Sequence, residues 1–389
     1  MLERILLFPY WLTLKIRHSL YDRGILKSYP CEVPTICVGN ITAGGTGKTP
    51  HTEMILDALL GSDEWGFKNL AVLSRGHKRK SRGFQQVTRD GSARFCGDEP
   101  LQIKRRYPSV TVAVDRPRVE GCRFLCHPDL LKTDKKGAGC RDKEIQPADL
   151  IILDDAFQYR RLRAWMNIVL VDWNRPLTKD RLLPFGRLRD LPERINKADI
   201  VIVSKCPAYM ENWEKSGWVR SLGIEGFDPE TCTGTNAEGR KVKVFFTCIR
   251  YRELEPVYAG EADSRFVYSK KLILFSGIAK DTPLRMYLSD KYKLVKRFTF
   301  SDHHNYTRMD IRRIMGAASS HPTAVVVCTE KDSQRVLDNK SVPGELKNRL
   351  FQIPIKVAFL TEEEGAIFSE TLQNSLREFH SESAQTPRG

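Results

Sequence analysis

A glycine-rich turn between an apolar run and a helical pattern constrains this chain more than any other feature. Residues 39–49 read GNITAGGTGKT, directly after the strand-like PTICV and before the helix-like PHTEMILDALL. Gly44, Gly45 and Gly47 let the backbone curl so that N–H groups face an anion, and the next helix adds its positive N-terminal end. Strand, glycine turn, Lys-Thr and helix in this order predict a phosphate-binding loop in an α/β fold.

The residues that follow the turn predict a nucleoside triphosphate with Mg²⁺ as the ligand. Lys48 is expected to reach the outer phosphates, Thr49 to hold Mg²⁺, and Thr46 to lie among the phosphate-binding amides. Thr42 stands where the usual GxxxxGK[ST] pattern has its first glycine. The alternative is a chance glycine-rich turn, which the order of strand, turn and helix disfavours.

A pair of acids supplies the expected second half of such a site. Asp154 and Asp155 close the apolar run 150–153. Adjacent carboxylates repel each other, and a divalent cation or water at the end of a buried strand relieves that repulsion. The alternative is that both acids cap the next helix.

Short runs rich in Val, Ile and Leu alternate with longer polar or helical segments, which predicts a mostly parallel sheet covered by helices. In the first part of the chain the expected strands are 35–39, 70–74, 110–114, 150–154, 168–172 and 200–204. In the second part they are 242–247, 272–276, 294–300, 324–328 and 351–359. The predicted fold class is α/β: a P-loop NTPase-like core with a mostly parallel sheet, plus a smaller C-terminal α/β domain.

Four regions follow from this pattern. We expect an N-terminal segment at 1–30, the P-loop core at 31–240, the smaller α/β domain that completes the active site at 241–380, and a disordered tail at 381–389.

Residues 2–21 are rich in Leu and aromatic side chains but carry basic residues, so no run approaches the roughly 18 residues that span a bilayer. Pro9 is expected to end or kink a helix here. The segment reads equally as a helix in the membrane interface or as a core helix.

The charge of the chain limits its partners. Lys and Arg number 63 against 48 Asp and Glu, which leaves a net charge of +15 and favours nucleic acid, an acidic membrane surface or phosphorylated substrates. The basic run 75–82 fits either a solvated surface or a site that binds phosphate groups.

Ten cysteines occur without any CxxC pair, which argues against a zinc site and favours free thiols in a reducing, cytosolic compartment.

Nine motifs together resemble one family, the tetraacyldisaccharide 4'-kinases, which are the lipid A 4'-kinases of Gram-negative bacteria. The motifs are VGNITAGGTGKTP (38–50), LSRGHKRKSRG (73–83), GDEP (97–100), ILDDAFQYRR (152–161), RLLPFGRLRD (181–190), KADIVIVSK (197–205), FSGIAK (275–280), FSDHHNY (300–306) and TEKD (329–332). They stand in the family's order over most of the chain.

The resemblance implies transfer of the γ-phosphate of ATP to the 4'-hydroxyl of a tetraacylated glucosamine disaccharide 1-phosphate. It implies a peripheral, monotopic enzyme on the cytoplasmic face of the bacterial inner membrane, with ATP and Mg²⁺ as cofactors. It therefore favours the interfacial interpretation of the N-terminal segment. The expected partners are the anionic glycolipid and the membrane surface, with no nucleic acid and no obligate protein partner.

The resemblance also assigns roles to individual residues. Asp98 matches the general base, assisted by a histidine at the position of His303. Arg189 would neutralise the transferring phosphoryl group, and Asp190, where the family has Glu, would lie near Mg²⁺ with Thr49, Asp154 and Asp155. Gln158 is expected near the same site. The chain departs from the family pattern at His77, Ala156 and Tyr159, and no role is assigned to those side chains.

Two other classes of function fit parts of the sequence. The charge and the basic run 75–82 suit a nucleic-acid-dependent ATPase or a polynucleotide kinase, although no RNP-like aromatic motif or zinc finger occurs. A metallochaperone-like GTPase would use the same core for assembly instead of transfer. The identity of the phosphate acceptor separates these three possibilities.

Overall fold

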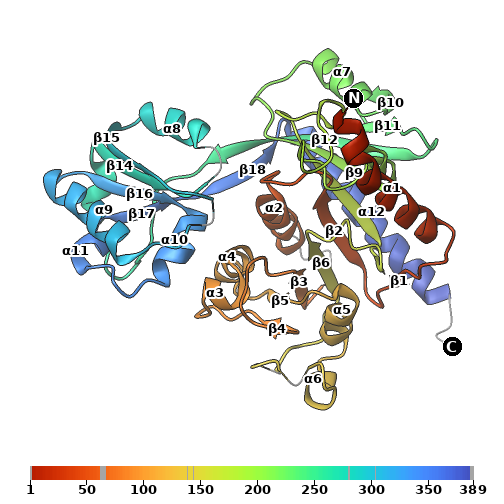
Figure 1. Ribbon diagram of the computed structural model, residues 1–389, viewed down its shortest axis with the longest axis horizontal. Coiled ribbons are helices and arrows are strands. Elements are labelled where there is room, and N and C mark those ends of the chain that lie inside the picture. Colours follow the sequence, from red (N-terminus) through yellow and green to blue (C-terminus); the bar gives the residue numbers. More distant parts are fainter. Residues whose placement is uncertain are drawn as a thin grey trace.

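Two main β-sheets organise the described residues, each covered by helices (Figure 1), and a third sheet has only two short strands. The computed structural model describes residues 2–61, 67–137, 139–142, 144–278, 281–302 and 304–385. Within them the larger sheet has eleven strands and the smaller has five. The predicted α/β class is confirmed.

The centre of the larger sheet is parallel, as the apolar runs predict. Its parallel strands are β5 (Thr111–Val114), β3 (Leu70–Ser74), β6 (Leu150–Asp154), β2 (Thr35–Asn40), β8 (Met166–Asp172), β9 (Ile200–Ser204) and β12 (Lys241–Tyr251), in that spatial order. Antiparallel strands flank them: β4 (Gln85–Gln86), β11 (Thr233–Thr235), β10 (Glu225–Asp228) and β18 (Ile355–Phe359). All six residues of β2 are buried, because helices cover both faces of the sheet.

Different helices cover the two faces of the larger sheet. One core cluster contains Leu14, Phe124 and Val219, and the other contains Ile55, Leu101 and Leu372. The helices on the first face are α1 (Leu2–Asp22), α5 (Arg118–Cys126) and α7 (Asn212–Ser221). Those on the second are α2 (Lys48–Leu60), α4 (Asp98–Arg106) and α12 (Glu362–Gln385). Short elements complete this part: β1 (Tyr29–Pro30) paired with β7 (Leu162–Arg163), α3 (Ala93–Cys96) and α6 (Leu130–Thr133).

The smaller sheet is also mainly parallel. Its strand order is β13 (Glu255–Pro256), β17 (Leu350–Ile353), β16 (Val325–Thr329), β14 (Lys271–Ser276) and β15 (Lys293–Thr299). Its helices are α8 (Thr282–Ser289), α9 (Arg308–Ser320), α10 (Glu330–Leu337) and α11 (Gly344–Lys347). The antiparallel pair β12–β18 connects it to the larger sheet.

Three expectations about the C-terminal half differ from the structure. Residues 241–251 form β12 of the larger sheet, so the smaller sheet begins at Glu255. The expected single strand 351–359 is divided at Pro354 into β17 and β18, because proline has no N–H to donate to a ladder. Residues 381–385 continue α12, whose last turns are anchored by an edge-on contact between Phe379 and Trp165, and the rest of the predicted tail lies outside the described residues.

The N-terminal helix α1 runs from Leu2 to Asp22 without ending at Pro9. A proline inside a helix removes a single backbone donor, and here the Pro9 carbonyl also accepts a bond from the Thr13 hydroxyl at 2.7 Å. Among the described residues, none of the helices is long and apolar enough to span a bilayer.

Candidate active site

The predicted phosphate loop lies between β2 and α2 at the carboxyl edge of the parallel strands. Gly44 (φ 115°) and Gly47 (φ 90°) adopt left-handed or related conformations that side chains disfavour. A Cβ at Gly44 would also come within 3.1 Å of Arg187 Nη1. Both glycines are therefore required by the local backbone, and Gly47 directly precedes the first turn of α2, where Lys48 and the buried Thr49 stand.

Neighbouring strands hold the loop in this shape. The Asn40 amide donates to Thr46 Oγ1 at 2.7 Å, and the Ser204 hydroxyl donates to the Thr46 carbonyl at 2.9 Å. Lys205 Nζ donates to the Gly45 carbonyl. Ser204 is the last residue of β9 and Lys205 comes directly after it, both within the motif KADIVIVSK. The sequence alone does not show that this motif contacts the phosphate loop.

Asp155 is the centre of an ionic network beside the loop. Its Oδ2 lies 3.7 Å from Lys48 Nζ and accepts a hydrogen bond from Arg189 Nη1 at 3.1 Å. Arg189 Nη2 also donates to Asp155 and to the Asn40 side chain. Burial would raise the pKa of Asp155, but Lys48 and Arg189 lower it to about 2. Three predicted site residues from three segments thus meet here.

Asp154 is completely buried beside this network. Its Oδ2 accepts a bond from the Ser74 hydroxyl at 3.0 Å, while its Oδ1 has no hydrogen-bond partner among the described residues. Burial, Glu99 and Asp155 raise its pKa to about 7. A buried carboxylate oxygen without a donor, next to a second carboxylate, is the kind of hard oxygen ligand that Mg²⁺ prefers. Asp154 Oδ1 therefore fits the predicted metal, while no group of three or more acidic, histidine or cysteine side chains among the described residues is placed to hold one.

Gln158 also lies at the loop, as expected. Its Nε2 donates to the Asn40 carbonyl at the end of β2. The two residues around it that depart from the family pattern have other contacts: Ala156 is buried in the core, and the Tyr159 ring lies 5.7 Å from the Arg118 guanidinium.

Asp98, the predicted general base, lies between the two sheets. It is the first residue of α4 and is only 8% exposed. Arg335 of α10 donates to its Oδ2, and Arg335 Nη1 is 3.4 Å from Oδ1 of the buried Asp332. The next residue, Glu99, pairs with Lys331 at 2.5 Å, and this lysine lowers the pKa of Glu99. His303, the predicted partner of Asp98, lies outside the described residues.

Arg335 and Lys331 were not expected at the site from the sequence. Both belong to α10: Lys331 lies within the motif TEKD, whereas Arg335 follows the motif and has no local signal of its own. Their partners on α4 are 237 and 232 positions away, and neither composition nor periodicity indicates such a pairing. The structure therefore pairs Arg335 with the predicted base Asp98, and Lys331 with the neighbouring Glu99.

Asp190 contacts a histidine of α1, unlike Asp154 and Asp155 at the end of β6, which contact Ser74, Lys48 and Arg189. Its Oδ1 lies 2.6 Å from His18 Nε2 of α1 and accepts the Leu191 N–H at 2.9 Å. The carboxylate is 1% exposed. Its proposed place near Mg²⁺ stays a prediction.

The basic run 75–82 divides into structural and exposed side chains. Arg79 is buried and donates to the Val114 and Gly83 carbonyls at 3.2 and 2.6 Å. Arg75, Lys78, Lys80 and Arg82 are exposed, as is His77. One arginine thus fixes the loop and leaves four cations available to solvent.

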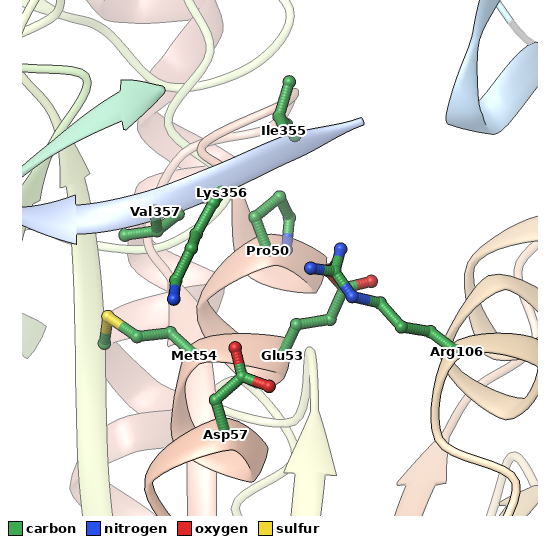
Figure 2. Close-up of a pocket in the computed structure, with 8 residues that line it drawn as sticks. All are labelled: Pro50, Glu53, Met54, Asp57, Arg106, Ile355, Lys356 and Val357. Carbon is green, nitrogen blue, oxygen red and sulfur yellow. The ribbon is translucent and has the colours of Figure 1, made fainter. Parts of the chain in front are cut away.

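A shallow recess between α2, α4 and β18 contains none of the predicted phosphate or metal ligands (Figure 2). Arg106 reaches from α4 to Glu53 of α2 at 2.7 Å and lies 3.7 Å from Glu330 of α10. Burial raises the pKa of Glu53 to about 8 although Arg106 opposes this shift. These contacts join α2, α4 and α10, so the recess belongs to the junction between the sheets.

The chain is similar to known proteins of one family. The family described as Tetraacyldisaccharide-1-P 4'-kinase matches residues 2–377. Tetraacyldisaccharide 4'-kinase of Parabacteroides distasonis is 35% identical over 363 residues, covering 92% of this chain and 89% of the relative. The Flavobacterium johnsoniae protein of the same name is 34% identical over 374 residues, covering 94% and 95%.

A solved structure extends the similarity to three dimensions. The "apo" form of LpxK from Aquifex aeolicus in complex with ATP has a TM-score of 0.65 and 25% identity, over 97% of this chain and 100% of that one. The family match, the sequence relatives and the fold agree with one another. The chain belongs to the tetraacyldisaccharide-1-P 4'-kinase family.

Proposed function

We propose that this chain transfers the γ-phosphate of ATP to the 4'-hydroxyl of a tetraacylated glucosamine disaccharide 1-phosphate. The observation that carries the proposal is the ionic network of Lys48, Asp155 and Arg189 beside the glycine loop. Phosphoryl transfer needs mainly positioned charge around the phosphates. Support for the substrates comes from relatives named tetraacyldisaccharide 4'-kinase and from the Aquifex aeolicus structure that holds ATP.

The nucleotide would occupy the loop at the carboxyl edge of the larger sheet. Amides of residues 44–47 and the N-terminus of α2 face the phosphates, and Lys48 contacts the outer ones. Thr49, Asp154 and Asp155 would hold Mg²⁺, with Asp190 nearby. When bound, the ion supplies positive charge against the phosphate oxygens.

The acceptor hydroxyl would be activated on the other side of the transferred group. Asp98 accepts the hydroxyl proton, and Arg335 pairs with this buried carboxylate and orients it. Arg189 neutralises charge that develops on the phosphoryl group. His303 assists Asp98 in this proposal. Asp98 lies on α4, which covers the larger sheet, and Arg335 lies on α10 of the smaller sheet, so the contact between these helices is part of the proposed active arrangement.

The glycolipid acceptor requires a membrane surface, and α1 offers a suitable one. Leu14 and His18 are buried against the core, whereas Leu6, Phe8 and Ile16 are more than half exposed. A helix with an exposed apolar face and basic side chains suits the boundary of an anionic bilayer. The two alternative interpretations of this segment therefore combine in one helix. We place the enzyme on the cytoplasmic face of the inner membrane, with the exposed cations of 75–82 near the 1-phosphate.

A test with two acceptors distinguishes this function from its rivals. The protein is incubated with γ-labelled ATP and Mg²⁺, and either tetraacyldisaccharide 1-phosphate in mixed micelles or a 5'-hydroxyl oligonucleotide is supplied. We expect label in the lipid alone. Label in the oligonucleotide, or ATP hydrolysis that rises with nucleic acid and falls steeply with salt, would favour the nucleic-acid-dependent alternative.

A further inference from the structure

The buried side of α1 contacts the segment that carries Arg189. The Tyr10 hydroxyl donates to the Arg189 carbonyl at 3.1 Å. The His18 ring lies 2.6 Å from the Asp190 carboxylate, and both side chains are almost completely buried. The N-terminal helix therefore holds the backbone of Arg189 and the side chain of its neighbour.

Arg189 is also fixed from the opposite side. Its guanidinium donates to Asp155 and to the Asn40 side chain at the base of the phosphate loop. A continuous series of contacts thus leads from α1 through Arg189 to Asp155 and Lys48. Every step in this series is a hydrogen bond, an ion pair or a covalent neighbour.

A second set of contacts ties α1 to the segment that follows Asp155. Arg17 Nη2 donates to the Gln158 carbonyl at 3.0 Å. Arg160 donates to the His18 carbonyl at 3.0 Å and pairs with Asp22 at 2.7 Å. The same helix therefore grips both segments whose side chains surround the phosphate loop.

The opposite side of α1 is apolar and exposed at Phe8, Leu12 and Ile16. Polar groups that contact catalytic segments and apolar groups that face outward thus share one rigid helix. A force that fixes the outer face, such as insertion in a lipid surface, also fixes the inner face, because a helix transmits displacement along its length.

We propose that Tyr10 and His18 are positioning residues that hold Arg189 in its catalytic place, so that seating α1 on an anionic lipid surface increases phosphoryl transfer. This inference rests on the kinase function and the membrane surface proposed above. It adds that α1 acts on the reaction itself besides anchoring the chain. A displacement of about 1 Å in a positioning contact typically costs up to ~100-fold in rate.

The test uses the full chain with His18→Ala, His18→Gln and Tyr10→Phe. Glutamine is the conservative variant, because its amide can still donate to Asp190. Thr13→Ala is the matched control, since the Thr13 hydroxyl bonds only within α1 to the Pro9 carbonyl among the described residues. Three quantities are measured: kcat for the disaccharide lipid, binding to phosphatidylglycerol vesicles, and KM for ATP.

We expect His18→Ala to retain vesicle binding and KM for ATP within about two-fold, and to lose kcat by ~10- to 100-fold. His18→Gln should recover most of that loss, and Tyr10→Phe should lose less than His18→Ala. Wild-type kcat should rise when the lipid acceptor is moved from neutral micelles to anionic vesicles, and His18→Ala should lose that increase.

Each contrary result overturns the inference. If His18→Ala shows wild-type kcat, or if it loses kcat only in proportion to the fraction of folded protein, the contact is structural alone. An equal rise on vesicles for wild type and His18→Ala would show that α1 merely anchors the chain. If the wild type phosphorylated the lipid neither in neutral micelles nor in anionic vesicles, the proposed function itself would be refuted. The wild-type measurements therefore test the function separately from the role of α1.

Discussion

Replacing Arg335 by methionine should expose how strongly the smaller sheet supports the predicted base. The Arg335 and Asp98 side chains are 6% and 10% exposed, so their pairing belongs to the buried regime. Removing one partner of a buried ion pair typically costs about 3–5 kcal/mol, because the other charge stays behind unpaired. An exposed pair would cost about 0–1 kcal/mol. We therefore expect Arg335→Met to lower the free energy of unfolding by ~3–5 kcal/mol.

The assay is urea unfolding followed by tryptophan fluorescence, with turnover measured in parallel. The double variant Asp98→Asn/Arg335→Met removes the charge that Arg335→Met leaves unpaired at Asp98, although Asp332 loses its arginine in both variants. It should therefore be more stable than Arg335→Met alone. Arg105→Met is the matched control, since Arg105 crosses the same interface at 2.5 Å but to the uncharged Gln334. Arg105 also donates to the Arg89 and Gly91 carbonyls at 3.2 and 3.3 Å, so its replacement removes hydrogen bonds to uncharged acceptors only. The loss of stability should therefore stay below that of Arg335→Met.

Activity should follow the same logic. Arg335→Met should lose kcat while the dissociation constant for ATP stays near the wild-type value, because no contact joins Arg335 to the phosphate loop among the described residues. The reasoning is refuted if Arg335→Met is no less stable than Arg105→Met, or if the double variant gains nothing over Arg335→Met.

Three further predictions concern other parts of the molecule. Burial raises the pKa of Glu53 to about 8, so Glu53 binds a proton more tightly in the folded protein than in the unfolded chain. Wild-type stability should therefore fall as the pH rises from about 4.5 to 8. Glu53→Gln should flatten this fall, which is measured as the urea midpoint at each pH. Phe8→Ser should weaken sedimentation with anionic vesicles while leaving the thermal midpoint within a degree or two, because Phe8 lies on the exposed face of α1; retained sedimentation would remove this face from the membrane contact. Cys31 should react first with iodoacetamide below neutral pH, since hydrogen bonds from the Cys122 and Cys126 thiols lower its pKa; peptide mapping that finds another thiol first would contradict this.

Much of the fold could be predicted because local signals in the chain agree with one another. The parallel strands are short, apolar and separated by helical patterns, and the glycine loop marks where β2 ends. The strand through 351–359 was wrong because Pro354 divides it between two sheets. The start of the smaller sheet was misplaced because β12 has eleven residues. Its first part pairs with β9 of the larger sheet, and its last part pairs with β18 in the connection between the sheets.

The site was predictable where its residues stand in motifs and unpredictable where they meet across the fold. Lys48, Asp155 and Arg189 each lie in a recognisable segment, and the structure brings them together. His18 and Arg335 carry no local signal, since their partners are 172 and 237 positions distant. Such pairs depend on how α1 and α10 pack, and packing is not written in periodicity or composition.

The most direct test of the proposed function is the position of the phosphate that the protein adds. Purified wild type, Lys48→Ala and Asp98→Asn are each incubated with ATP, Mg²⁺ and tetraacyldisaccharide 1-phosphate, and the lipid product is located by NMR. We predict a single new phosphomonoester on the 4'-oxygen for the wild type and none for either variant, with ATP still bound by Asp98→Asn. Phosphate at another position, or undiminished product from Lys48→Ala, would contradict the account.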